Sequence, residues 1–499
     1  MKRSLVWRMS LLALALAPVL ATAQTRCERV LQQLAGQLAD AICVESTDLT
    51  TTNPATTPAN NSLPGLPAFA FTPITDRGVI APSAAKRPPI TKRVPGVQIQ
   101  ARFANDATGQ GRFLLRLPDD WNGSLVVAGA SGTRSEFNGD FAWSDFVLQK
   151  GFAYASQNKG VLNLAFSTAA DPLACRLNPV SALYVHFYDN DPGQPFSRWR
   201  DFMVLAADVA QKGVHARYGH KPRHTYAVGT SNGGYQVRRA IETAPQLFDG
   251  GVDWEGTFVD AHAPNLLTDL PPAVLNYPDY VASGFSASST AAKNIRAAGY
   301  PPDIVAGAAS MYTNYWGSFW EVTQCQWQKR LDPGFDTYAN GGTGTYNYVA
   351  RLSKSDVGAQ LAAFATSGKI KRPLITVAGT MDALLPIDHH ARAYARLVAQ
   401  RGDDDDDDDR DGDKHSRKDR DDRAAYRLYE VQNGNHIETY QDTFSQLELI
   451  QPHAQRAFEL LVRHVQQRTP LPPDQCIRRG GLIEDAPAAT GKCAELFVP

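Results

Sequence analysis

The sequence predicts an α/β protein with a mostly parallel sheet, helices on both faces of that sheet, and an inserted lid. From Val94 onward, apolar runs of strand length alternate with helical patterns, which is typical of a parallel sheet. The strand-like run "HTYAVGT" leads through a glycine-rich turn into a helical pattern. Residues 258–365 break this alternation, which resumes in "RPLITVAGTMDALLP". The chain has 499 residues, 43% of them hydrophobic, which is enough for a large core.

The first residues have the pattern of a secretory signal. The segment "MKRSLVWRMSLLALALAPVLATAQ" has a basic start, an apolar run over residues 11–20, and small residues Ala21 and Ala23 before Gln24. We expect residues 1–23 to be a signal peptide and the mature protein to be secreted or periplasmic. No other apolar run approaches the roughly 20 residues of a membrane-spanning helix, so none is expected in the mature protein.

Residues 24–93 are predicted to form an N-terminal helix and a linker. Apolar positions over residues 26–43 recur at helical spacing, and the following "ESTDLTTTNPATTPANNSLPG" is rich in Thr, Pro and Asn.

Six cysteines follow the signal, and an even number in an exported chain indicates disulfides. No CxxC pair or Cys/His cluster suggests zinc instead. Proximity in sequence favours Cys27–Cys43 and Cys476–Cys493, which leaves Cys175–Cys325; other pairings stay open.

The sheet domain is expected in two parts, residues 94–257 and 366–470, followed by a tail over residues 471–499. In the first part the strand patterns are "GVQIQARF", "RFLLRLP", "GSLVVAGASG", "FAYASQN", "HTYAVGT" and "DGGVDWEG". The helical patterns between them are "WSDFVLQKG", "FSRWRDFMVLAADVAQKGVHARYG" and "YQVRRAIETAP". The second part adds strands in "RPLITVAGTMDALLP" and "AYRLYEVQ" and helices in "DHHARAYARLVAQR" and "LIQPHAQRAFELLVRHVQQ".

An aspartate run, Asp403–Asp409, interrupts the second part within residues 402–423. Its carboxylates lack the spacing of an EF-hand calcium loop. A like-charge run beside mixed charge is typical of a solvated segment, so we expect a disordered loop there and no metal site.

Residues 258–365 are predicted to form the lid. An aromatic cluster falls within this segment, and its members are Tyr312, Tyr315, Trp316, Phe319, Trp320 and Trp327. One interpretation is an ordinary core. The other, which the position between two strands favours, is a cap over an apolar pocket, with Tyr315, Trp316 and Trp320 binding the substrate.

The turn after "HTYAVGT" reads Gly229-Thr230-Ser231-Asn232-Gly233, a GxSxG motif between a strand and a helix. In that context small neighbours allow a tight turn that exposes the serine hydroxyl above the sheet. Ser231 is therefore the candidate nucleophile, and it needs a histidine to take its proton and an acid to orient that histidine.

Asp382 and His436 are the candidate partners, because each directly follows a later strand and the chain order is Ser, acid, His. Asp388 is a rival acid, but it precedes a helical pattern and fits a helix cap. The other histidines lie in helical patterns or too early in the chain. For the oxyanion, we expect backbone N–H donors from Asn232 and from Ser131 in "AGASGTR".

With these motifs, residues 94–470 resemble the α/β-hydrolase superfamily. The span from "GFAYASQNKG" to "LFDGGVDWEG" is similar to the tannase and feruloyl esterase family. That family typically has cysteines directly before its serine and histidine, where this chain has Thr230 and Asn435. "SNGG", "YEVQNGNHIETY" and "TPLPPDQCIR" resemble the extracellular D-3-hydroxybutyrate oligomer hydrolases, a likeness that implies Ser231, Asp382 and His436 as the triad.

The sequence thus predicts an exported serine carboxylic-ester hydrolase acting through an acyl-enzyme, with no metal or organic cofactor. The resemblance implies short 3-hydroxybutyrate oligomers as substrates, with feruloyl or galloyl esters as the alternative. A serine peptidase and a non-catalytic binding protein on the same scaffold are further alternatives. The formal net charge of −1 predicts no general attraction to nucleic acid or anionic membranes, and the oligomeric state stays open.

Overall fold

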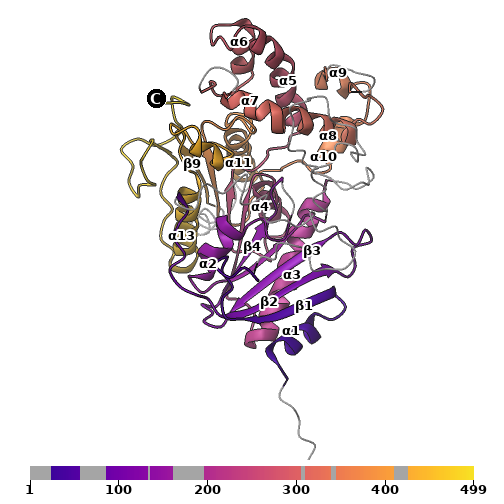
Figure 1. The fold of residues 1–499 in the computed structure, drawn as a ribbon, viewed down its shortest axis with the longest axis vertical. Helices are drawn as coiled ribbons and strands as arrows, with labels where there is room; N and C mark the ends of the chain where they lie inside the picture. Colours follow the sequence, from indigo (N-terminus) through magenta and orange to yellow (C-terminus); the bar gives the residue numbers. More distant parts are fainter. Residues whose placement is uncertain are drawn as a thin grey trace, which may run out of the picture.

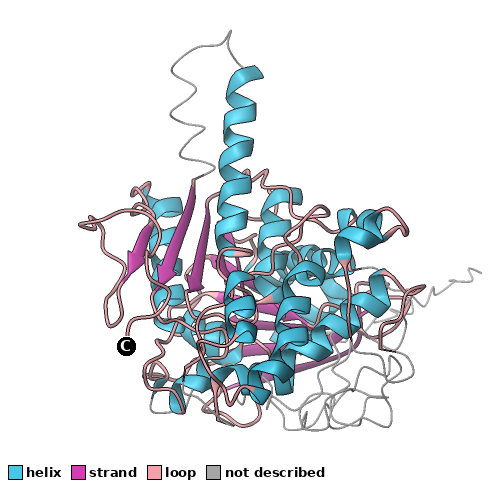
Figure 2. Ribbon diagram, turned by 90° about the horizontal axis from the view of Figure 1, so that it is seen from above, coloured by secondary structure: helices cyan, strands magenta, loops and turns pink. Residues whose placement is uncertain are grey.

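In the computed structural model, one sheet runs through the molecule and carries helices on both faces (Figures 1 and 2). The structure describes residues 24–56, 86–132, 135–160, 196–304, 309–338, 344–408 and 425–499. Within these ranges ten strands form the sheet, in the order β1-β2-β3-β5-β4-β6-β7-β8-β9-β10. The strands are β1 (Leu38–Ser46), β2 (Gly96–Phe103), β3 (Arg112–Pro118), β4 (Ser124–Gly129), β5 (Ala153–Gln157), β6 (His224–Thr230), β7 (Gly250–Trp254), β8 (Leu374–Gly379), β9 (Tyr426–Val431) and β10 (Gln475–Ile477).

Neighbouring strands are antiparallel on the β1 side, where β1, β2, β3 and β5 pair. From β5 through β4 to β10 every pair is parallel. The predicted mostly parallel sheet, and with it the α/β-hydrolase fold, is therefore confirmed.

Successive residues of β4 point to opposite faces of the sheet, and each face has its own helices. Leu125 and Val127 pack with residues of α1 (Arg26–Leu34), α3 (Arg198–Tyr218), α4 (Asn232–Thr243) and α11 (Ala391–Asp408). Val126 and Ala128 pack with residues of α2 (Asp145–Leu148) and α13 (Gln451–Gln467). Because both faces are covered, the strand reads as an unbroken apolar run.

The segment predicted as a lid forms helices at one end of the molecule (Figure 1). They are α5 (Leu266–Ala282), α6 (Thr290–Ala297), α7 (Met311–Tyr315), α8 (Glu321–Leu331), α9 (Tyr348–Leu352) and α10 (Val357–Ala362). Their apolar core also contains Met381, Leu384 and Ile437, which belong to the loops after β8 and β9. This segment therefore packs directly on those two loops.

The N-terminal segment differs from the single helix predicted over residues 26–43. α1 ends at Leu34, and the chain then forms the edge strand β1, antiparallel to β2. Gly36 has a φ of 83°, a left-handed conformation that glycine adopts readily and that turns the chain out of the helix. Pairing with β2 then outweighs the helical spacing. The predicted disulfide Cys27–Cys43 is confirmed and joins α1 to β1.

The aspartate run also differs from the prediction of a disordered loop over residues 402–423. α11 continues to Asp408, and it is the long helix that projects from the body at the top of Figure 2. The helix begins with residues that include the packed Ala393 and Tyr394, and adding residues to a helix that has already formed avoids the cost of nucleation. Residues 409–424 lie outside the described residues.

Other predictions fall wholly or partly outside the described residues. These are the signal peptide over residues 1–23, most of the linker, and Cys175 of the Cys175–Cys325 pair. The disulfide Cys476–Cys493 is confirmed. Among the helices of the described ranges, none is both long and apolar enough to cross a membrane.

Candidate active site

Ser231 occupies a sharp turn between β6, which ends at Thr230, and α4, which begins at Asn232. Its φ of 59° and ψ of −123° are unusual for a residue with a side chain. Its N–H donates to the carbonyl of Trp254 at 2.8 Å, which fixes the turn to the end of β7. The strained backbone is held by its neighbours, as is common at functional sites.

The glycines around Ser231 are required by close backbone contacts. A Cβ on Gly229 would lie 2.3 Å from the carbonyl oxygen of Gly233, and one on Gly233 would lie 2.4 Å from that of Gly129. Both distances are far below van der Waals contact, so only glycine fits, and the GxSxG pattern follows from this packing of α4 against β4 and β6.

His436 joins Ser231 to Asp382. Its Nε2 lies 2.9 Å from Ser231 Oγ, and its Nδ1 lies 2.8 Å from Asp382 Oδ2. Asp382 Oδ1 accepts the backbone N–H groups of Leu384 and Leu385 at 2.8 and 2.7 Å, which stabilise the ionised carboxylate. A carboxylate at Nδ1 favours the tautomer with its proton there, so Nε2 presents a lone pair to the serine hydroxyl.

A second carboxyl group, which the sequence analysis did not single out, also faces His436. Glu255 follows β7 directly, and its Oε2 lies 3.5 Å from His436 Nδ1. Burial, and next the charge of Asp382, raise the pKa of Glu255 well above its usual range. In the sequence, "DGGVDWEG" shows only the pattern of a strand. The signal that could have identified Glu255 is its position at the carboxyl end of that strand, level with Ser231.

Only one of the two predicted oxyanion donors keeps its position. Asn232 opens α4 and lines the cavity beside Ser231, as predicted for the residue after the nucleophile. The N–H of Ser131, however, donates to Asn138 Oδ1 at 2.8 Å and is therefore occupied. The next residue, Gly132, lines the cavity with Ser231, so the second candidate donor shifts by one residue to the Gly132 N–H.

A cavity opens at Ser231. Its lining is apolar with a few polar groups: Gly132, Lys159, Trp199, Ser231, Asn232, Thr257, Leu266, Thr323, Trp327, Leu384 and Leu385. Lys159 Nζ lies 5.1 Å from the ring centre of Trp199. The cavity thus combines a hydroxyl nucleophile, two indole rings and one cationic side chain.

The three predicted substrate-binding aromatics do not line this cavity. Tyr315 is buried and donates its hydroxyl to Asn435 Oδ1 at 2.8 Å, and the Trp320 indole donates to the carbonyl of Ala383 at 2.6 Å. Trp316 stacks on Tyr277 with ring centres 4.7 Å apart. Tyr315 and Trp320 therefore join the lid segment to the loops that carry Asp382 and His436, whereas Trp316 packs on α5 within the segment. Of the aromatic cluster, Trp327 lines the cavity.

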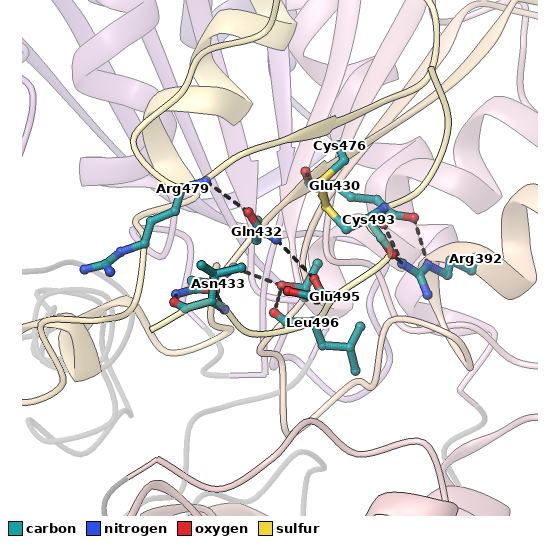
Figure 3. The surroundings of a disulfide bond; sticks show 11 residues. Arg392, Glu430, Gln432, Asn433, Cys476, Arg479, Cys493, Glu495 and Leu496 are labelled. Atoms are coloured by element: carbon teal, nitrogen blue, oxygen red, sulfur yellow. Dashed lines mark hydrogen bonds and ion pairs between the residues drawn. A yellow bond between two sulfur atoms is a disulfide. The ribbon is translucent and has the colours of Figure 1, made fainter. Parts of the chain in front are cut away.

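The end of the chain supports the same two loops (Figure 3). Asn433 Nδ2 donates to the carbonyl of Val498 at 2.6 Å, while the Val498 N–H donates to Asn433 Oδ1 at 2.8 Å. The Thr380 hydroxyl donates to the carbonyl of Leu496 and accepts the N–H of Asn433. Thr380 lies two residues before Asp382, and Asn433 lies three residues before His436. The tail therefore contacts both of the loops that carry these two residues.

The disulfide Cys476–Cys493 anchors this tail to β10 (Figure 3). The N–H of Cys493 donates to Glu430 Oε2 at 2.7 Å, and Arg392 Nη2 donates to the carbonyl of Cys493 at 2.9 Å. Glu430 and Arg392 form a buried ion pair at 2.6 Å. The last residues of the chain, 493–499, are thus held at Cys493 by a covalent bond and by hydrogen bonds to a buried charge pair.

Residues 340–494 match the family model described as 3HB-oligomer hydrolase. A D-(-)-3-hydroxybutyrate oligomer hydrolase from Burkholderia cenocepacia is 33% identical over 125 residues, 24% of this chain and 15% of that protein. One from Ralstonia nicotianae is 33% identical over 126 residues, again 24% of this chain and 15% of its relative. The matched part therefore spans about 15% of these relatives' length.

The predicted resemblance to these hydrolases is confirmed over the last third of the chain. The family match contains Asp382 and His436 but not Ser231.

Two solved structures align with most of the chain. Feruloyl esterase B from Aspergillus oryzae aligns with 89% of this chain and 91% of its own, with a TM-score of 0.48 and 13% identity. Tannin acyl hydrolase from Aspergillus niger aligns with 90% of this chain and 89% of its own, with a TM-score of 0.45 and 12% identity.

Proposed function

We propose that the protein is a serine carboxylic-ester hydrolase. The observation that carries this proposal is the hydrogen-bonded series from Asp382 through His436 to Ser231, with Ser231 exposed to a cavity at a strained turn. A serine hydroxyl is a weak nucleophile near neutral pH, and an oriented imidazole supplies the base that it lacks.

In this mechanism His436 Nε2 takes the proton of Ser231 Oγ as the oxygen attacks the ester carbonyl. Asp382 stabilises the resulting imidazolium, and the N–H groups of Asn232 and Gly132 stabilise the oxyanion. His436 then protonates the leaving alcohol, which yields an acyl-enzyme. Water, deprotonated by the same imidazole, releases the acid and restores Ser231.

Short 3-hydroxybutyrate oligomers are the substrates that we propose. The relatives matched over the last third of the chain carry this activity in their names. Such an oligomer combines apolar methyl-bearing units with a terminal carboxylate, and the cavity combines apolar side chains with the ammonium of Lys159. Charge pairing in a largely apolar site favours an anionic ester over a neutral one.

Aromatic esters are a second candidate, favoured by Trp199 and Trp327 in the cavity lining. Either indole offers a flat apolar surface on which a feruloyl or galloyl ring can stack.

Export from the cytoplasm is also part of the proposal, and the two described disulfides support it because such bonds form in oxidising compartments.

The test compares hydrolysis by the purified protein and by Ser231→Ala on 3-hydroxybutyrate dimer and trimer, methyl ferulate and methyl gallate. We expect turnover of the oligomers and a fall of at least about 1,000-fold in the variant. Turnover of only the aromatic esters would replace the substrate class. Equal turnover by both proteins would overturn Ser231 as the nucleophile.

A further inference from the structure

Two carboxyl groups compete for one ring nitrogen of His436. Asp382 Oδ2 lies 2.8 Å from Nδ1 and Glu255 Oε2 lies 3.5 Å from it. One oxygen of each acid and one ring nitrogen all lie within 4.8 Å of one another, and all three residues are buried. A serine nucleophile requires only one acid behind its histidine, so the second group has no role in the mechanism as proposed.

Glu255 is held in this position by the ends of two strands. Its N–H donates to the carbonyl of Val377 at 2.9 Å, and its Oε1 accepts the N–H of Gly379 at 2.9 Å. Its φ is 51°, a left-handed value that a non-glycine residue rarely adopts. Within the described residues Oε2 meets no hydrogen-bond partner at full hydrogen-bond geometry, and it lies 3.5 Å from His436 Nδ1.

The surroundings of the two acids decide which one is ionised. Asp382 accepts two backbone N–H groups and faces the imidazole, whereas the backbone gives Glu255 a single N–H. Two carboxylates this close together in a buried site do not both ionise readily. Burial, and next the charge of Asp382, raise the pKa of Glu255 well above its usual range.

We infer that Glu255 is a second acid of this site, a positioning residue that supports His436 from the end of β7 and assumes the role of Asp382 when the charge of Asp382 is removed. The inference rests on the proposed function, because Glu255 acts on Ser231 only through His436. Burial, and next the charge of Asp382, raise the pKa of Glu255, so removing the Asp382 charge removes the second of these two causes. Glu255 then releases its proton to solvent and faces Nδ1 as the carboxylate.

The test is a double-mutant cycle between Asp382→Asn and Glu255→Gln, read as hydrolysis of p-nitrophenyl butyrate. We expect Asp382→Asn to retain activity, with a loss of about 100-fold instead of the roughly 10,000-fold seen where a triad has a single acid. Adding Glu255→Gln should cost about a further 100-fold, against about 5-fold in the wild-type background. Equal costs of Glu255→Gln in the two backgrounds would overturn the inference.

A matched control is Asp382→Asn with Glu438→Gln. Glu438 is another buried carboxyl group, it contributes to the field at Glu255, and its own contacts are with the backbone of Ile450 and Gln451. This variant should match Asp382→Asn alone. Asp382→Asn with Glu255→Asp keeps a carboxylate one methylene short and should recover part of the lost activity, which a purely structural role of Glu255 would not predict.

Labelling of Ser231 by a fluorophosphonate separates failure of this inference from failure of the proposed function. Suppose that the wild-type protein is labelled. If the Asp382→Asn variant and the double variant then react at the same rate as each other, Glu255 has no part in activating Ser231. If the wild-type protein is not labelled, the proposed function itself fails. Thermal unfolding followed by circular dichroism shows whether each variant is folded. If the variant with Asp382→Asn and Glu255→Gln is misfolded, the activity of Asp382→Asn with Glu255→Asp is compared with that of Asp382→Asn alone instead.

Discussion

At the scale of single residues, Lys159 is the side chain that we expect to bear most directly on substrate choice. It is buried, it lines the cavity beside Ser231, and its φ of 63° places it in the left-handed region. A cation in an apolar site discriminates strongly between charged and neutral ligands, because its interaction with an anion is poorly screened there.

Lys159→Met keeps the length and apolar stem of the side chain and removes its charge. For 3-hydroxybutyrate dimer as the free acid, we expect KM to rise about 10- to 50-fold with kcat nearly unchanged, the cost of about 1.5 to 2.5 kcal/mol of uniform binding. For the methyl ester of the same dimer, KM should change less than about twofold. Equal changes for both substrates would show that Lys159 does not recognise the carboxylate.

The residues of the site were predictable to the extent that strand order determines them. Ser231 follows β6 directly, and Asp382 and His436 lie in the loops after β8 and β9, so strand order alone predicts that the three meet at one edge of the sheet. The N–H of Ser131, predicted as the second oxyanion donor, donates to a side chain, Asn138, and no sequence pattern reveals such a contact. Glu255 was missed because a carboxylate at the end of a strand also suits an ordinary turn.

At the scale of elements, the loops after β8 and β9 are braced by the C-terminal tail. Thr380 contributes one hydroxyl that both donates to Leu496 and accepts from Asn433. The two loops are also joined directly, because the Met381 N–H donates to the carbonyl of Gly434 at 2.8 Å and Asn435 Nδ2 donates to the carbonyl of Met381 at 2.5 Å. The tail contacts add to these hydrogen bonds in fixing the separation of the acid and the imidazole. An error of about 1 Å in such a separation is enough to lower catalysis substantially.

Thr380→Val removes this hydroxyl at nearly constant volume. The carbonyl of Leu496 and the N–H of Asn433 then each lose the hydrogen bond that they make with it. We expect a loss of about 1 to 3 kcal/mol in stability and a fall in kcat of about 3- to 10-fold, with KM little changed. The matched control is Thr225→Val, which removes a hydroxyl bonded to Gln211 at the opposite end of β6. The control should lose stability without losing kcat, and equal kcat effects would contradict a positioning role for the tail.

The order of strands and helices was predictable, but two element boundaries were not. Apolar runs bounded by turn residues locate the central strands because both faces of a parallel sheet are buried. β1 was hidden because its strand is mostly half-exposed and follows helical spacing directly, so only its pairing with β2 reveals it. The aromatic residues of the lid segment were predicted to bind the substrate. A sequence indicates that such rings are buried, but it does not show whether the substrate or another part of the protein covers them.

At the scale of the whole molecule, stability depends on carboxyl groups that the fold keeps protonated. Burial raises the pKa of Glu136 and of Glu438 to about 8, from an ordinary value of 4.5. A group of this kind binds its proton more tightly in the folded state than in the unfolded state. Between about pH 4.5 and pH 8 the folded protein therefore holds more protons, and stability falls as pH rises through that window.

Glu438→Gln tests this dependence at a site where the neutral replacement keeps the essential contacts. Glu438 Oε1 accepts the N–H groups of Ile450 and Gln451 at the start of α13, and an amide oxygen accepts them equally well. We expect wild-type protein and variant to unfold at similar denaturant concentrations at pH 5. At pH 8 the variant should be more stable, by up to about 3 kcal/mol, because only the wild-type chain gains by releasing a proton on unfolding.

The matched control for this prediction is Glu459→Gln on the same helix, where the carboxylate is exposed and pairs with Lys150 at 2.8 Å. Its stability should follow that of the wild-type protein at both pH values, since a surface pair contributes little. Urea unfolding of the three proteins at pH 5 and pH 8 measures the effect directly. A Glu438→Gln protein that tracks the wild type at both pH values would show that Glu438 is ionised in the folded state, with its two backbone donors outweighing the cost of burial.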